Sequence, residues 1–165
     1  MGVGGPHVSR PRAPSGYGYS TEPEGMLAWE KVGAALAAAN IYWIASALPD
    51  GSPHLHSIWG GFVDPHLYIE GGDTTRWARN LVADSRVGFG VESGGLHING
   101  RGAVRRSPAG ESFEALKANY GRKYDYTPDN DEFWRIDPSV VIALDMSSLE
   151  AFASSPTKFT FEEPE

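Results

Sequence analysis

The sequence has no cysteine, no long apolar run and no excess of positive charge. The absence of cysteine excludes disulfide bonds, thiolate metal ligands and cysteine nucleophiles. No stretch approaches the roughly 18 apolar residues of a membrane-spanning helix, and residues 1–25 contain no apolar core of the kind found in secretory signals. A net charge of -7 argues against general nucleic-acid binding, which requires a positive field. We therefore expect a cytoplasmic protein that binds neither membranes nor nucleic acids.

Recognisable catalytic motifs are also missing. There is no nucleophile elbow, no P-loop and no suggestively spaced pair of carboxylates, and no βαβ unit follows the Gly-x-Gly strings. His54 and His56 would project from the same face of a strand, and with His66 or His97 they could bind a metal. No nearby carboxylate completes a known spacing, so solvent-facing or interface histidines are the better interpretation. We expect no metal site.

The length of 165 residues indicates one domain. Residues 1–25 are rich in Gly, Pro and Ser, which predicts a flexible N-terminal arm, and residues 26–162 form the domain itself. An arm that lies across a partner subunit is the alternative.

Apolar periodicity within the domain predicts mainly strands. We expect helices at 26–39, 74–83 and 109–120, a polar loop at 121–134, and strands at 41–48, 52–63, 66–70, 86–92, 96–106, 139–145 and 157–161. Consecutive antiparallel strands favour a small barrel over a doubly wound sheet.

The stretch 70-EGGDTTRWARNL-81 contains the most informative charges. Asp73 can cap a helix, and Arg76 and Arg79 would be neighbours on one face of that helix. Glycines that let the backbone approach a ligand, a helix N-terminus and two guanidinium groups together suit a phosphate. The alternative is a capped helix with solvated arginines. Trp77 is better interpreted as a core residue than as a lid over a flat ligand.

An ordered series of segments carries a family resemblance. The segments are 42-YWIAS-46, 49-PDGSPHLHSIWGGFVD-64, 67-LYIEGG-72, 76-RWARNLVADSRV-87, 97-HINGRGAVRR-106, 120-YGRKY-124 and 156-PTKFTF-161. Together they resemble the pyridoxamine 5'-phosphate oxidase-like family of FMN- or deazaflavin (F420)-binding split β-barrels, over residues 26 to 161. The resemblance implies a mainly β fold, an antiparallel split β-barrel with short peripheral helices.

The resemblance also implies a cofactor site. In the family the segment matching 76-RWARNL-81 contacts the cofactor phosphate, and Trp77 stands where a lysine is usual. The strand matching 56-HSIWG-60 lines the flavin ring. The predicted cofactor-binding residues are Ser57, Ile58, Trp59, Thr74, Thr75, Arg76, Trp77, Arg79, Asn80, Lys123 and Lys158.

The function that the resemblance implies is hydride transfer between FMN or F420 and a small organic substrate. The sequence distinguishes neither the cofactor nor the substrate, and it offers no catalytic side chain. The apolar strand 41–48, with Trp43 and Trp59, predicts a homodimer, and the family places the cofactor at the subunit interface. The alternatives are a non-catalytic flavin or deazaflavin carrier and a haem-handling split-barrel protein, which the absorbance of the purified protein would distinguish.

Overall fold

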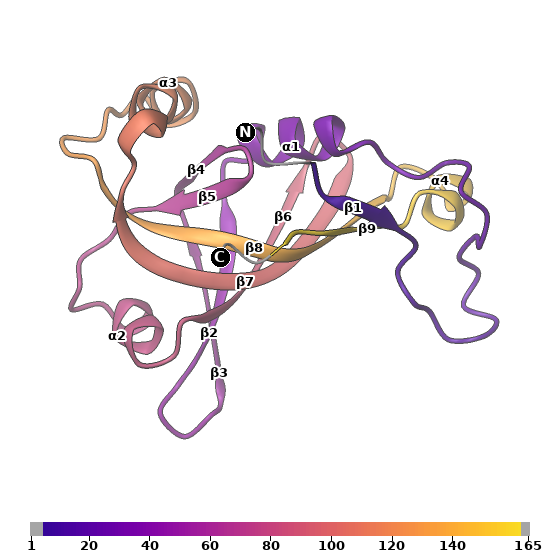
Figure 1. Cartoon of the computed structure of the whole chain (residues 1–165), viewed down its shortest axis with the longest axis horizontal. Coiled ribbons are helices and arrows are strands. Elements are labelled where there is room, and N and C mark those ends of the chain that lie inside the picture. The colour runs from indigo at the N-terminus through magenta and orange to yellow at the C-terminus, as the bar shows by residue number, and fades with distance from the viewer. Residues whose placement is uncertain (1–4, 163–165) are drawn as a thin grey trace.

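The computed structural model describes residues 5–162, which form an antiparallel β-barrel with short helices around it (Figure 1). The helices are α1 (Trp29–Ala38), α2 (Arg76–Ala83), α3 (Phe113–Tyr124) and α4 (Leu149–Ser154), with a 3-10 turn at Gly110–Ser112. The strands are β1 (His7–Ser9), β2 (Tyr42–Ala47), β3 (Pro53–Ile58), β4 (Gly60–Val63), β5 (His66–Ile69), β6 (Arg86–Ser93), β7 (Leu96–Pro108), β8 (Glu132–Asp145) and β9 (Thr157–Thr160).

The barrel closes because the continuous stretch of β3 and β4 pairs with β2 at one end and with β5 at the other. The sheet order is β1-β9-β8-β7-β6-β2-β3, while β4 pairs with β5 and β5 pairs with β8. Only Trp59 separates β3 from β4, so this stretch joins β2 to β5 and completes the circle. The expected antiparallel split β-barrel is confirmed. In Figure 1 the long, curved β7 and β8 cross the barrel, with α1 and α3 on one side and α2 on the other.

Alternation along the strands places the core. On β6, Val87, Phe89 and Val91 point inward and are buried, while Gly88 and Gly90 face outward. A second apolar cluster lies outside the barrel, between α3 and the strands β5 and β8. It is formed by Tyr68, Ala109, Leu116, Tyr120 and Phe133. Among the described residues, no helix is long and apolar enough to cross a membrane.

The polar loop expected at 121–134 is shorter in the structure and covers only residues 125–131. Helix α3 continues to Tyr124, and β8 begins at Glu132. Both extensions follow from packing that polar composition hides, since Phe133 is fully buried beneath α3 and the last turn of α3 docks on α1. The short elements β1 and α4 were not expected either.

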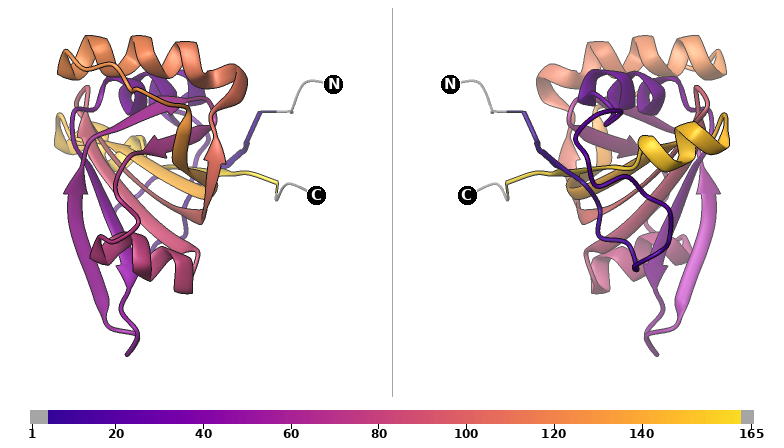
Figure 2. Two further views of the ribbon diagram at one scale, coloured as in Figure 1. Left: turned by 90° about the vertical axis from the view of Figure 1, so that its left-hand side faces the viewer. Right: turned by 90° about the vertical axis from the view of Figure 1, so that its right-hand side faces the viewer.

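The N-terminal segment differs from the expected free arm over the residues that the structure describes. Residues His7–Ser9 pair with β9, and residues 1–4 lie outside the description. The Arg10 guanidinium donates to four backbone carbonyls, those of Glu22, Glu24, Ser154 and Pro156. Figure 2 shows the segment running beside α4. The segment is therefore hydrogen-bonded to the C-terminal end of the fold.

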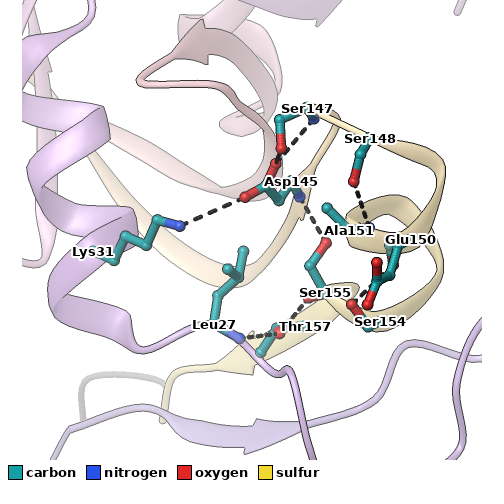
Figure 3. A network of polar contacts seen from close by, with 10 residues as sticks. All are labelled: Leu27, Lys31, Asp145, Ser147, Ser148, Glu150, Ala151, Ser154, Ser155 and Thr157. Atoms are coloured by element: carbon teal, nitrogen blue, oxygen red, sulfur yellow. Dashed lines mark hydrogen bonds and ion pairs between the residues drawn. The ribbon is translucent and has the colours of Figure 1, made fainter.

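A polar network fixes α4 and β9 to α1 (Figure 3). The backbone amide of Leu27 donates to Thr157 Oγ1 at 2.7 Å, and this hydroxyl donates to the carbonyl of Ser155 at 2.7 Å. Ser155 Oγ in turn accepts from the amide of Asp145, whose carboxylate lies 3.6 Å from Lys31 Nζ. Ser155 and Thr157 are buried, so each hydroxyl replaces a hydrogen bond that water would otherwise make.

Helix α3 caps the C-terminal end of α1. The final carbonyls of a helix have no partner within the helix. Here they accept from side chains of α3 and β2, in the pairs Leu36 with Tyr42 Oη, Ala37 with Asn119 Nδ2, Ala39 with Lys123 Nζ and Asn40 with Tyr124 Oη. When it is protonated, Lys123 also places a positive charge at the negative end of the helix dipole.

The same side chains also bind the point where β3 becomes β4 and the barrel closes, which we call the seam. Lys123 Nζ donates to the carbonyl of Gly60 at 2.6 Å and to Tyr42 Oη at 3.0 Å, and the amide of Gly60 donates to Tyr124 Oη at 3.1 Å. A Cβ at Gly60 would lie 3.0 Å from the Tyr42 ring and from the Tyr68 carbonyl, so the seam requires glycine. Burial lowers the pKa of Lys123 to about 7.

We expect Lys123→Met to lower the free energy of unfolding by about 2 to 4 kcal/mol, because it leaves partly buried carbonyls on α1 and β4 without a donor. Urea denaturation at pH 7 measures this. Lys117→Met is the matched control. Lys117 lies on the same helix, pairs with the exposed Glu114 and lies over the Phe113 ring, so its cost should be about 1 kcal/mol or less. Equal costs for the two variants would contradict a structural role for Lys123.

Candidate cofactor site

The N-cap of helix α2 is Thr75, not Asp73. Thr75 Oγ1 accepts from the amide of Ala78 at 3.4 Å and donates to the carbonyl of Gly72 at 2.9 Å. Asp73 lies two residues before this cap, and its carboxylate is 3.8 Å from the guanidinium of Arg106. The expectation that Asp73 caps the helix is therefore wrong, because threonine is also a good N-cap and lies closer to the helix.

The two sides of α2 differ in burial and in charge. Trp77, Ala78, Asn80 and Leu81 are buried against the barrel. Arg76 and Arg79 are exposed on the other side, and within residues 5–162 the arginines in ion pairs are others: Arg86, Arg105, Arg106 and Arg135. The first turns of α2 thus offer two exposed guanidinium groups with no carboxylate partner in the described chain, beside Thr74 and Thr75.

Trp77 belongs to the core. It is 7% exposed, its ring stacks on His56 at a centroid distance of 5.5 Å and an interplanar angle of 11°, and it meets Trp134 edge-on at 5.5 Å. A Cβ at Gly71 would lie 2.3 Å from Trp77 Cζ2. Gly71 therefore makes room for the indole, whereas the sequence suggested that this glycine admits a ligand. Asn80 is also turned inward and donates to Ser46 Oγ at 3.1 Å.

The predicted ring-lining residues lie at the junction of β3 and β4. Ser57 and Trp59 are exposed, while Ile58 is half-buried and packs against the core. The indole of Trp59 stacks on Tyr124 at 4.5 Å and 6°, so α3 holds this exposed ring in place. Tyr124 is a supporting residue that sequence reasoning missed. Its signal in the sequence is the segment 120-YGRKY-124, which predicted Lys123 as the binding residue instead.

The two predicted lysines lie in different places. Lys123 donates hydrogen bonds to three protein oxygens, as described above, and is therefore part of the fold. Lys158 lies on β9, and the strand registers connect it to Ser57 through Ile142, Asn99, Gly90 and Trp43 in turn. Five strand spacings separate the two ends, about 24 Å along the sheet. Within one chain, Lys158 and Ser57 do not form one site.

A shallow groove of about 830 Å³ crosses the outer face of β2, β6 and β7. Its floor is small and apolar, with Ala45, Gly88 and Ala103 among the lining residues. The charged residues on its border are Asp84, Arg86, Arg101 and Asp137. Arg86 is paired with Asp84, and Asp137 is contacted by Arg105, Arg135 and His66. This border was not predicted, since it forms only when distant strands align.

The fold is a split barrel, with exposed arginines on α2 and an exposed aromatic ring where β3 becomes β4. The family model described as pyridoxamine 5'-phosphate oxidase matches residues 28–150, and the chain belongs to this family. The match spans the barrel from α1 to the start of α4.

Solved structures agree on the fold. A conserved hypothetical protein from Mycobacterium tuberculosis is 20% identical with a TM-score of 0.62, over 75% of this chain and 88% of that chain. A heme binding protein from Mycobacterium smegmatis is 18% identical with a TM-score of 0.59, over 82% and 63%. An F420 reductase is 19% identical with a TM-score of 0.52, over 66% and 93%. No curated protein matches the chain.

We expect Gly71→Ala to destabilise the protein by about 1 to 3 kcal/mol, because the new methyl group displaces the Trp77 ring from the core. Gly72→Ala is the matched control, since nothing lies within 4 Å of a Cβ at that position. Thermal unfolding of both variants measures the difference. If both melt like the wild type, the close contact between Gly71 and Trp77 does not constrain the fold.

Proposed function

We propose that the protein is an oxidoreductase that uses FMN or F420 for hydride transfer to or from a small organic substrate. Family membership supports a flavin-type cofactor, and the F420 reductase among the structural relatives supports the deazaflavin as an equal candidate. The observation that carries the proposal is the pair Arg76 and Arg79, exposed on α2 without a carboxylate partner in residues 5–162.

The residues at α2 fit a phosphate group. Guanidinium groups bind phosphate through charge-assisted hydrogen bonds, and two of them three residues apart on a helix can reach one anion. Both are exposed, so binding does not first require breaking an ion pair. Trp77 takes the usual lysine position but is turned into the core, so the phosphate would be held from the solvent side of α2 only.

The remaining roles follow from the strand junction. Trp59 and Ser57 offer an exposed aromatic ring and a hydroxyl on the outward side of β3 and β4, a surface against which a flat ring can pack. Tyr124 stacks on the Trp59 ring and so holds its orientation. When bound, FMN or F420 supplies the hydride chemistry, which is consistent with a site that has no candidate nucleophile.

Arg76→Ala and Arg79→Ala should each raise the dissociation constant for FMN or F420 about ten- to a hundredfold, as the loss of one hydrogen bond to a charged group implies. The apo-protein should melt at the wild-type temperature, because both side chains are exposed. Fluorescence titration with each cofactor measures the affinity, and Arg12→Ala provides an exposed control elsewhere. If both variants bind like the wild type, α2 is only a capped, solvated helix and the cofactor proposal loses its local support.

We further propose that the protein is a homodimer through the outer face of β2, β3 and β6. Trp43 is 50% exposed and Leu55 is 62% exposed on this face, next to the bare positions Gly88 and Gly90. A two-fold contact uses the same patch on both copies. Large side chains beside a bare strip make this patch self-complementary.

Leu55→Arg should convert the dimer to a monomer at micromolar concentration, because it places a charge in the centre of an apolar contact. Sedimentation velocity measures this. Leu149→Arg is the control, since Leu149 is exposed on α4, away from the face, and that variant should stay dimeric. A wild-type monomer, or a Leu55→Arg dimer, would contradict the proposed interface.

A further inference from the structure

Two histidines lie side by side on the inward face of β3. His54 and His56 are two residues apart on the strand, so their rings project to the same side. Their ring centroids are 5.7 Å apart. Trp77 of α2 stacks on the His56 ring, so this imidazole neighbours both a second imidazole and an indole.

The ring nitrogens of this pair are buried without hydrogen-bond partners. Nδ1 of His54 and both Nδ1 and Nε2 of His56 have no partner among the described residues. A buried nitrogen that lacks a partner costs about 1–3 kcal/mol, and native proteins rarely leave such groups unsatisfied. The expectation of solvent-facing histidines is therefore wrong for these three nitrogens, and that of interface histidines stays a prediction.

The surroundings of the pair are polar. Ser46 is the strand partner of His54 in the register between β2 and β3, and its hydroxyl accepts from Asn80 Nδ2. Ser46 and Asn80 are 6% and 3% exposed. Burial and the neighbouring His54 lower the pKa of His56.

We propose that His54 and His56 together bind one divalent transition-metal ion of the Zn²⁺ type. A ring nitrogen binds Zn²⁺ at about 2.0–2.1 Å, which puts each ring centroid about 3.2 Å from the ion and allows centroids up to about 6.4 Å apart. The observed separation lies below that limit. Rotation of the rings about χ2, a broad torsion, brings the nitrogens toward a common ion.

The other histidines are not part of this site. His66 Nδ1 lies 2.8 Å from a carboxylate oxygen of Asp137, and His97 lies on β7, paired in register with Glu92. Among residues 5–162 no third His, Cys, Asp or Glu completes a cluster with the pair. The remaining coordination positions belong to water or to a small external donor, as in open zinc sites.

The site is independent of the proposed cofactor function. The histidines lie between β3 and the inner side of α2, whereas Arg76 and Arg79 lie on the outer side of that helix. Loss of metal binding therefore leaves the arginine titrations interpretable, and the reverse also holds.

Calorimetric titration of the metal-free, full-length protein with ZnCl₂ at pH 7.5 tests the proposal. The wild type should bind one ion per chain. His54→Gln and His56→Gln should each bind at least about tenfold more weakly, since ligand-sphere changes typically cost that much. His97→Gln is the matched control and should bind like the wild type.

A second measurement requires no variant. Zn²⁺ should raise the melting temperature of the wild-type protein in a concentration-dependent way, because the ion binds the folded state. Bound Cu²⁺ should show coupling to two imidazole nitrogens in its electron paramagnetic resonance spectrum. Absence of zinc binding to the wild type, or equal binding by folded His54→Gln and His97→Gln proteins, would overturn the proposal.

Discussion

The carbonyl groups at the C-terminal end of α1 need hydrogen-bond donors. Helix α3 supplies most of these donors, and this requirement fixes how α3 packs at the seam. Asn119, Lys123 and Tyr124 reach these carbonyls from a single face of α3. The same lysine and tyrosine also bind Gly60, where β3 becomes β4. One helix face thereby joins a helix end to the point where the barrel closes. Because Tyr124 also stacks on Trp59, the docking of α3 fixes the exposed ring beside the candidate cofactor site.

Helix α2 separates structural and chemical roles between its two sides. Its inner side contributes the indole of Trp77, which fills the space between His56 and Trp134. A lysine at that position would bring a charge that a half-buried aromatic stack cannot solvate. The consequence is that any anion at α2 must rely on the outer arginines. Relative to the lysine that the sequence resemblance led us to expect, the proposed site has one phosphate contact fewer and more core packing, and Gly71 leaves the room that the indole needs.

The pattern of apolar and charged residues along the sequence predicted those elements that depend on neighbouring residues alone. The alternation of Val87, Phe89 and Val91 identified β6 and its bare face, and helical spacing identified the arginines of α2. The start of β8 was missed because Phe133 is buried against Leu116 and Tyr120 of α3, a contact that the strand pattern does not contain. The helix cap was misplaced because Asp73 and Thr75 are both good caps, and only the backbone conformation selects between them. The stacking of His56 on Trp77 likewise depends on tertiary placement that no spacing rule contains.

The outward face of β3 connects the proposed cofactor site with the proposed dimer contact. Ser57, a predicted ring-lining residue, is the direct strand partner of Trp43, and Leu55 is the partner of Ala45 in the next outward row. A second copy seated on Trp43 and Leu55 would therefore cover the sheet up to the edge of Ser57. Since a flat ring held only by Trp59 and Ser57 would leave one face in water, the partner copy is the available source of the second wall. Assembly and cofactor retention should then depend on each other, because the same few outward positions of β2 and β3 contribute to both.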